Sequence, residues 1–218
     1  MRKIKRSIAK KIHSIEEGIK GASSSQEIID ILMAHGYPPD EIRKAEILLE
    51  NVKHLTSTQV EDYGDKYAAN ELVNKQWDIS YSTYMIILKI VRVVFKDELD
   101  MLKRFKATGK RRQSLSGWLN DANIFYSNIL DTPAAIERLQ RYGYTYERLQ
   151  KEYDGVKEVE ALHSRKLAEK GEAQQSTVER DKAFDELCNW YSDFRAIARI
   201  AFYEKPQLLE ALGIKIKN

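Results

Sequence analysis

Apolar residues recur along this chain at steps of three and four, the spacing of one face of an α-helix. The first such row is Ile8, Ile12, Ile15 and Ile19. A much longer row predicts a helix over about residues 39 to 96, and a similar stretch predicts another over about 146 to 203. Its period of about 3.5 residues is that of a coiled-coil seam. The expected seam in the first long stretch is Ile42, Leu49, Val52, Val60, Tyr63, Tyr67, Asn70, Asn74, Trp77, Tyr81, Tyr84, Leu88, Val91 and Phe95.

One glycine interrupts each long stretch, at Gly64 and Gly171. The seam keeps its phase through both glycines, which favours continuous helices of about 60 residues, or about 90 Å. The alternative is that both glycines end a helix in the left-handed conformation. The long stretches would then fold as helical hairpins that form a four-helix bundle.

The sequence also repeats itself at an offset of 107 residues. Gly36-Tyr37 recurs as Gly143-Tyr144, and shifting the chain by this offset aligns further identical pairs. The pairs include Val52 with Val159, Gly64 with Gly171, Asp78 with Asp185, Tyr84 with Tyr191, and Phe95 with Phe202. Helical periodicity alone does not place glycine, so we predict a tandem duplication, with repeats over residues 1–110 and 111–218.

Each repeat shows the same order of predicted helices. A first helix is followed by a short one, whose N-cap is Ser24 or Ser25 in one repeat and Asp131 or Thr132 in the other. The short helix ends at the Gly-Tyr pair, the long helix follows, and a last short helix lies near Leu102 or Leu209. Pro206 is expected to open the last of these helices.

Composition agrees with an all-α fold. Of 218 residues, 43% are hydrophobic and 32% are charged, with only 10 glycines and 4 prolines to form turns. A single cysteine, Cys188, excludes an intramolecular disulfide. The basic start is followed by no long apolar stretch, and the most apolar run, Met85 to Phe95, is too short to span a membrane. We therefore expect a cytoplasmic protein without a transmembrane segment.

Few residues have the spacing of a catalytic or metal site. Glu160 and His163 have the Glu-x-x-His spacing of di-iron bundles, but the repeat positions Lys53 and Thr56 supply no matching ligands. Cys188 lies on the expected seam, where a lone cysteine is usually a small buried apolar residue. We therefore expect no metal, no cofactor and no enzymatic activity. The stripe formed by Tyr63, Tyr67, Trp77, Tyr81 and Tyr84 is interpreted as core packing, with a stacking surface as the alternative.

Charge is the least evenly distributed property of the chain. Two basic clusters lie near the starts of the repeats, while the formal net charge of the whole chain is only +3. The rest of the chain is therefore acidic. Solvated surface is the simplest interpretation, and binding of phosphates or anionic lipids is the alternative. The candidate polyanion-binding residues are Lys3, Lys5, Arg6, Lys10, Lys11, Lys103, Arg104, Lys106, Lys110, Arg111 and Arg112.

These patterns favour a non-enzymatic helical scaffold or protein-interaction protein, whose partner is another copy or a different protein. The alternative is a nucleic-acid- or polyanion-binding protein that uses the two basic clusters. Binding that weakens steeply with salt would distinguish the alternative from the scaffold, because each neutralised phosphate releases counterions.

Overall fold

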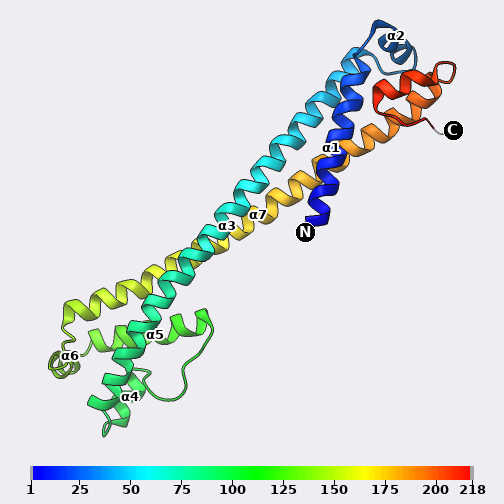
Figure 1. The fold of residues 1–218 in the computed structure, drawn as a ribbon. Coiled ribbons are helices and arrows are strands. Elements are labelled where there is room, and N and C mark those ends of the chain that lie inside the picture. Colours follow the sequence, from blue (N-terminus) through cyan, green and yellow to red (C-terminus); the bar gives the residue numbers. More distant parts are fainter. Residues whose placement is uncertain (1, 217–218) are drawn as a thin grey trace. The chain divides into compact units, whose positions relative to one another are not determined.

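Two long continuous helices form the framework of this all-α protein. The computed structural model describes the backbone of residues 2–216 and the side chains of residues 8–216. Helices α3 (Pro39–Val94) and α7 (Tyr146–Ala201) each contain 56 residues and pass through Gly64 and Gly171 without a break (Figure 1). The prediction of continuous helices is confirmed, and the hairpin alternative is wrong.

Shorter helices flank the long ones in the same order in both halves. The first half contains α1 (Arg2–Ala22), α2 (Gln26–Ala34), α3 and α4 (Leu99–Arg104). The second half contains α5 (Leu115–Leu130), α6 (Pro133–Gln140), α7 and a 3-10 helix, η1 (Pro206–Leu212). No strand occurs between residues 2 and 216. The helix order and the 107-residue offset of α3 and α7 agree with the expected duplication, which itself stays a prediction.

The turns before the long helices depend on glycine. Gly36 and Gly143 have φ angles of 87° and 79°, in the left-handed region where a side chain is strained.

The short helices that precede these turns, α2 and α6, begin differently from each other. The Ser25 hydroxyl caps α2 by accepting a hydrogen bond from the Ile28 amide, whereas Thr132 makes no such bond at the start of α6. Pro133 begins α6, where its missing N–H is not needed.

The compact units of the fold are not the sequence repeats. Unit 1 contains the chain up to Asp62 and from Ala173 onward, and unit 2 contains Tyr63–Glu172. Each unit therefore combines the first part of one repeat with the last part of the other. Unit 1 contains α1, α2 and η1 with segments of α3 and α7. Unit 2 contains α4, α5 and α6 with the remaining segments of the long helices.

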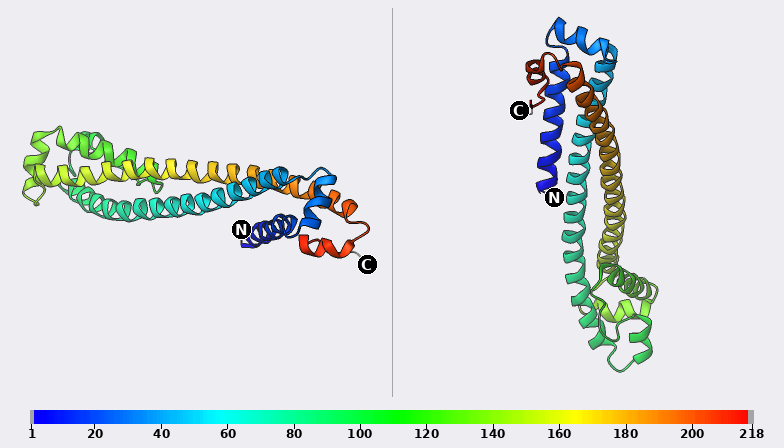
Figure 2. Two further views of the ribbon diagram at one scale, coloured as in Figure 1. Left: turned by 90° about the horizontal axis from the view of Figure 1, so that it is seen from above. Right: turned by 90° about the vertical axis from the view of Figure 1, so that its right-hand side faces the viewer.

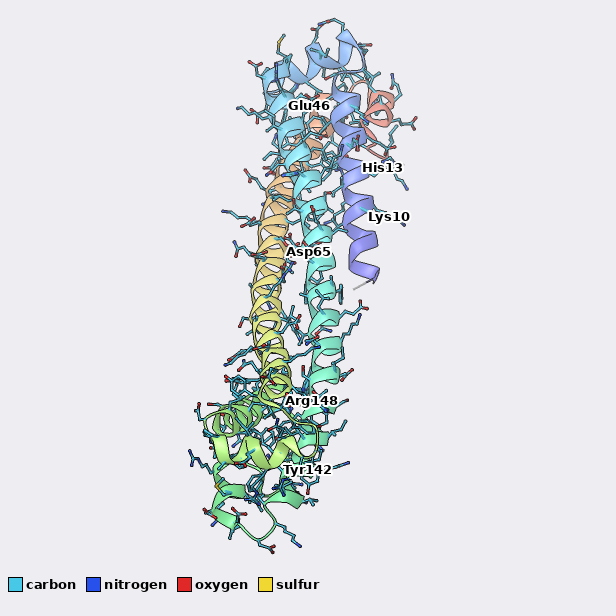
Figure 3. The ribbon with its side chains drawn as sticks, turned by 90° about the vertical axis from the view of Figure 1, so that its left-hand side faces the viewer. Lys10, His13, Glu46, Asp65, Tyr142 and Arg148 are labelled. Carbon is cyan, nitrogen blue, oxygen red and sulfur yellow. The ribbon has the colours of Figure 1, made fainter. Side chains whose placement is uncertain are left out.

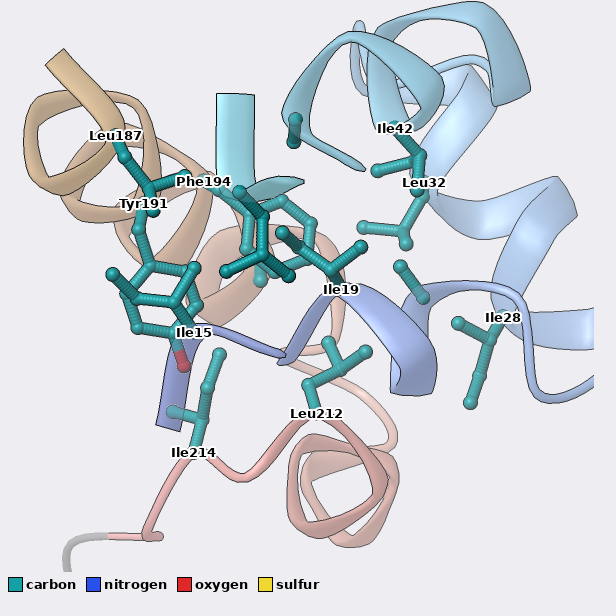
Figure 4. Packing of buried hydrophobic residues seen from close by; sticks show 14 of the residues in the cluster. Ile15, Ile19, Ile28, Leu32, Ile42, Leu187, Tyr191, Phe194, Leu212 and Ile214 are labelled. Carbon is teal, nitrogen blue, oxygen red and sulfur yellow. The ribbon is translucent and has the colours of Figure 1, made fainter. Parts of the chain in front are cut away.

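The core of unit 1 forms where α1 packs against α7 and η1. Ile15 and Ile19 of α1 are buried with Leu187 and Phe194 of α7 and with Leu212 (Figure 4). The backbones of α1 and η1 lie close together, and both views in Figure 2 show the two helices side by side. Gly18 permits the close approach of α1 to α7, because a Cβ at this position would overlap the ring of Tyr191. The isoleucine row of the first helix thus contributes to the core as predicted.

The core of unit 2 is strongly aromatic. Trp118 and Phe125 of α5 pack against Tyr84 of α3, with ring centroids 6.3 and 5.1 Å from the Tyr84 ring in edge-on contacts. At the end of α3, Phe95 packs edge-on against Phe105, which lies just after α4. Such contacts bury large apolar areas and add a small geometric preference. Packing is therefore the main role of the buried part of the predicted aromatic stripe.

The predicted seam of α3 is wrong in its middle. Val60, Tyr67 and Asn74 are exposed, whereas Gln59, Ala69, Val73 and Ser80 are buried. The prediction followed large apolar residues and passed over these smaller and polar side chains. The buried positions are separated by ten, four and seven residues, which are sums of steps of three and four, so the period was right and the phase shifted by one residue. A coiled coil stays a prediction.

Gly64 and Gly171 test the continuity of the long helices. A Cβ at either position would meet no atom within 4 Å outside its own helix, and neither glycine has a positive φ. We expect Gly64→Ala and Gly171→Ala each to raise the free energy of unfolding by about 0.5–1 kcal/mol, because alanine is favoured inside a helix. Urea unfolding followed by circular dichroism measures this change.

Gly21 in α1 provides the matched control for these two substitutions. It is also a helical glycine, but a Cβ there would clash with the backbone carbonyl oxygen of Ala211 in η1. Gly21→Ala should therefore lower the free energy of unfolding, whereas Gly64→Ala and Gly171→Ala should raise it. A loss of stability in Gly64→Ala would contradict the unbroken helix at that position.

Candidate interaction sites

The first basic cluster lies on α1. Lys3, Lys5 and Arg6 fall where only the backbone is described, so the placement of their side chains lies outside the described residues. Lys10 and Lys11 are exposed on α1, and Figure 3 labels Lys10. The Lys11 ammonium lies 5.9 Å from the ring centroid of Phe184. Whether this cluster binds a polyanion stays a prediction.

The second basic cluster begins at the end of α4 and continues into the connection between α4 and α5, which we call the basic loop (residues 105–113). Phe105 and Ala107 are buried in the core of unit 2 and fix the start of the loop. Lys106 has a φ of 54°, and Gly109 has a φ of 74°. The Lys106 amide donates to the carbonyl of Lys103, and the Ala107 amide donates to the carbonyl of Leu102. The loop thus leaves α4 through a tight turn.

Two arginines bind four consecutive carbonyl oxygens of the basic loop. Arg92 of α3 donates to the carbonyls of Ala107, at 2.7 Å, and Gly109, at 2.9 Å. Arg111 donates to the carbonyl of Lys106, at 2.6 Å, and to that of Thr108. Charged donors make stronger hydrogen bonds than neutral ones. Arg92 therefore ties residues 107 and 109 of the loop to α3, while Arg111, itself a loop residue, ties residues 106 and 108 to its own side chain.

Arg111 is also part of a buried polar group. Its side chain is only 9% exposed, and its Nη1 donates to the Tyr84 hydroxyl at 2.9 Å. Nη1 lies 4.0 Å from Oδ2 of Asp121, a carboxylate on α5 whose side chain is 4% exposed. Two buried atoms of this pair, Nε of Arg111 and Oδ1 of Asp121, have no hydrogen-bond partner among the described residues. The pair therefore retains one free donor and one free acceptor.

A pocket of about 440 Å³ opens beside this pair, and we call it the basic pocket. Four basic side chains of the second cluster line it together with Arg111, Asp121 and Thr108; these four are Lys103, Lys106, Lys110 and Arg112. None of the four forms an ion pair with a carboxylate among the described side chains. Arg104 is exposed but does not line the pocket. The structure thus brings together five of the six residues predicted in this cluster.

A second candidate surface lies on the outer face of α3 in unit 2 and was missed from the sequence. Four apolar side chains recur there every seventh residue and remain 47%, 53%, 55% and 65% exposed, and we call them the outer row: Leu72, Ile79, Ile86 and Val93. Their spacing places them on one side of the helix. The row is visible in the sequence as a heptad of aliphatic residues, but it lies on the face opposite the predicted seam.

The outer row is bordered by a directional pattern of charges. At 100° per residue, Glu71, Asp78 and Lys89 of α3 project along one flank of the row. Lys96 lies in the turn that follows α3, 4.0 Å from Asp97. All four are exposed; the carboxylates precede the middle of the row and the lysines follow it. On the face itself, between residues 68 and 94, Lys75 is the one charged side chain. The surface is therefore apolar in the middle and oppositely charged toward its two ends.

A groove adjoins the outer row on its other side. It has a volume of about 580 Å³ and lies between Gln76, Ile79 and Thr83 of α3 and the first turns of α7. Gly155 leaves room at its floor, where Ser80 donates a hydrogen bond to the Gly155 carbonyl at 3.2 Å. Arg148, labelled in Figure 3, lies on the α7 wall and donates to Glu152 at 3.2 Å. Burial raises the pKa of Glu152 above its usual range.

Unit 1 contains a smaller cavity with a buried arginine. It has a volume of about 330 Å³, and Ile8 and Ile12 of α1 line it with Gln59 and Arg180. Arg180 donates to the Gln59 amide oxygen at 2.9 Å and to the Asp181 carboxylate. These bonds satisfy a guanidinium that is mostly buried.

The remaining sequence candidates are separate from one another. Glu160 is exposed and pairs with Lys157 at 3.4 Å, while His163 is half-buried. Among the described side chains, no group of three histidine, cysteine or acidic residues has the proximity needed to hold a metal ion. Cys188 is a free, half-buried thiol, and burial raises its pKa. Neither motif thus forms part of a larger cluster.

Neither a membrane-spanning helix nor a similar known protein indicates a function for this chain. Among the described residues, no helix is both long enough and apolar enough to cross a bilayer. Comparison of the chain with protein-family models, curated proteins and solved structures finds no match. Its function therefore has to be inferred from its own surfaces and pockets.

Proposed function

We propose that this protein is a non-enzymatic helical scaffold that associates with a second copy of itself through the outer row of α3. The observation that carries the proposal is the exposed heptad of Leu72, Ile79, Ile86 and Val93. Single exposed apolar residues are common on protein surfaces, whereas a continuous apolar stripe marks an interaction site. The row extends over about 33 Å of helix, at 1.5 Å per residue.

A second copy is favoured over another partner because the surface complements itself. If the two helices run antiparallel, Leu72 faces Val93 of the partner subunit, and Ile79 faces Ile86 of the partner subunit. The same arrangement brings Asp78 near Lys89 of the partner subunit, and it places Glu71 toward the end of the partner's α3 that Lys96 follows. A parallel arrangement would place the charged flanks of the two helices on opposite sides of the contact, so these charges would not meet. Such charge pairs contribute little affinity but select the orientation.

The second repeat supports a specific role for the outer row. Glu179, Glu186 and Asp193 of α7 are the positions 107 residues after Leu72, Ile79 and Ile86, and all three are exposed. The position that corresponds to Val93 is Ile200, which is apolar and exposed, so the two helices differ at three of the four positions. We infer that the two repeats arose by duplication and then diverged on this face. Apolar residues were thus not retained wherever this helix is repeated. The outer row distinguishes α3 from α7, as a dedicated contact surface should.

The direct test is the oligomeric state of a variant with two charges in the row. Burial of four apolar side chains per subunit has to offset a large loss of translational and rotational freedom. We therefore expect the intact protein to dimerise with a dissociation constant of the order of micromolar. Ile79→Glu combined with Ile86→Glu should raise that constant at least about 100-fold, because it buries unpaired charges at the centre. Sedimentation equilibrium measures it.

Two further variants make the test specific. Ile47→Glu is the matched control, because Ile47 is an exposed isoleucine on α3 outside the row; it should leave the dissociation constant unchanged. Asp78→Lys should weaken the dimer, and adding Lys89→Asp should restore it if the helices are antiparallel. A protein that remains monomeric at millimolar concentration would contradict self-association, and equal losses in the Ile47 and row variants would contradict the proposed surface.

A further inference from the structure

The basic pocket has the features of a prepared anion site. Its walls are four basic side chains with no ion-pair partner among the described residues, whereas some exposed lysines elsewhere, such as Lys20, Lys44 and Lys157, pair with nearby glutamates. Concentrated charge of one sign raises the local concentration of counterions. The pocket therefore attracts anions more strongly than a surface on which lysines and glutamates alternate.

The floor of the pocket is rigid and only partly satisfied. Arg92 and Arg111 bind the carbonyl oxygens of residues 106–109, so the backbone that supports Lys106 and Lys110 is fixed. The Arg111 side chain is more than nine-tenths buried, lines the pocket, and keeps Nε as an unpartnered donor. A buried donor without a partner is costly, but this Nε is enclosed, so an anion in the pocket would meet the charge of the guanidinium and not this atom. The floor thus supports the walls without offering an open donor of its own.

Arg112 is held at the edge of the pocket by packing against the first turn of α5. A Cβ added to Gly117 would lie 2.8 Å from both Cβ and Cδ of Arg112, so the aliphatic part of Arg112 lies directly over this glycine. The Gly117 amide donates to the Ser114 hydroxyl at 3.2 Å and caps the helix. Positioning a guanidinium before binding reduces the entropy lost when it binds an anion.

We propose that the basic pocket binds a compact oligophosphate, meaning two or three linked phosphate groups, either free or carried by a nucleotide. A single phosphate monoester carries about −1.5 to −2 charges and cannot neutralise four unpaired cations. Linked phosphates supply more charge in a small volume. Asp121 is paired with Arg111 at the floor, so its carboxylate does not cancel the charge of the walls.

The composition of the pocket disfavours binding of single-stranded nucleic acid. Proteins that bind single strands combine a basic groove with aromatic side chains that stack on the bases. The pocket lining contains no aromatic residue, and its cations converge within one loop and the end of α4. A ligand recognised only through its phosphates fits this arrangement better than a strand that follows an extended groove.

The test is isothermal titration calorimetry of the full chain with sodium tripolyphosphate in 0.15 M salt. We expect one tripolyphosphate per chain, bound at least about 30-fold more tightly than orthophosphate. The affinity for a nucleoside triphosphate should be within about threefold of that for tripolyphosphate, because the pocket lining contains no aromatic residue that could stack on the base. Absence of tripolyphosphate binding, or equal affinity for orthophosphate, would overturn the proposal.

Two charge reversals distinguish the pocket from a diffuse basic surface. Lys110→Glu changes a residue of the pocket wall and should weaken tripolyphosphate binding at least about 10-fold. Arg104→Glu makes the same change of charge in the same cluster and should weaken binding less than about threefold, because Arg104 does not line the pocket and salt screens charges that do not contact the anion. Both residues are exposed, so both variants should fold, as thermal unfolding will verify.

An oligonucleotide of about 20 nucleotides provides the opposing outcome. If it binds more tightly than tripolyphosphate and both variants weaken it equally, the basic cluster is a nucleic-acid surface and the oligophosphate site is contradicted. If it binds more weakly than tripolyphosphate, the compact site is supported. The outer row of α3 is not altered in either variant, so this test is independent of self-association.

Discussion

Replacing Trp118 by alanine should lower the free energy of unfolding by about 3–5 kcal/mol, the range for truncating a large buried aromatic side chain. Trp118 is 1% exposed, and its ring centroid lies 6.2 Å from that of Trp77 and 6.3 Å from those of Tyr81 and Tyr84. The substitution would leave a cavity between α3 and α5 that these rings cannot fill without moving. Urea unfolding followed by circular dichroism, at one fixed protein concentration, measures the loss.

Trp118→Phe separates packing from hydrogen bonding in this prediction. The indole Nε1 of Trp118 is buried and has no hydrogen-bond partner among the described residues, so the phenylalanine variant loses packing but no hydrogen bond. We expect it to lose less than half as much stability as the alanine variant. Equal losses in the two variants would show that filling this volume contributes little and would contradict the assigned role of Trp118.

The elements of this fold could be predicted from the sequence because they depend on local patterns. The glycines at 36 and 143 mark left-handed turns, and the helix period passes through Gly64 and Gly171. Steps of three and four therefore predicted the long helices to within two residues at their ends. Single glycines inside helices of this length cost only about 1 kcal/mol each, which packing along the helix easily offsets.

The phase of the buried face could not be predicted in the same way. In the middle of α3 the inward positions are Gln59, Ala69 and Ser80, and none of these has the bulk that marks a seam. Gln59 is buried because Arg180 and Thr177 from α7 provide hydrogen bonds to its amide. Such partners are more than 100 residues away in sequence, so the periodicity of one helix cannot identify them.

The sequence alone also could not predict which residues form the two candidate sites. The sequence identified the charges between Lys103 and Arg112 but gave each the same role. In the folded protein, Arg111 binds the loop carbonyls and lies at the buried floor of the pocket. Lys110 and Arg112 line the pocket, whereas Arg104 does not. The outer row of α3 was predictable in principle, because its heptad spacing is visible. It becomes informative only once the opposite face is known to fill the core.

Removing the Arg111 guanidinium should lower stability by about 3–5 kcal/mol, because breaking a buried ion pair leaves a charge without compensation. In Arg111→Met, the carbonyls of Lys106 and Thr108 and the Tyr84 hydroxyl each lose a hydrogen-bond donor. Asp121 then remains buried without its cationic neighbour. Methionine keeps most of the apolar volume of the side chain, so the loss reports on the polar contacts. Chemical unfolding of this variant measures it.

Arg112→Met is the control for this loss, because Arg112 is the adjacent arginine in sequence but is exposed. It should change stability by no more than about 0.5 kcal/mol. Adding Asp121→Asn to Arg111→Met should recover at least about 1 kcal/mol, because it removes the uncompensated charge, and coupled neighbours depart from additivity by this amount. If the two arginine variants were equally stable, the basic loop would not depend on Arg111. If Asp121→Asn recovered nothing, the buried carboxylate would not be the source of the loss, and the missing carbonyl donors would account for it instead.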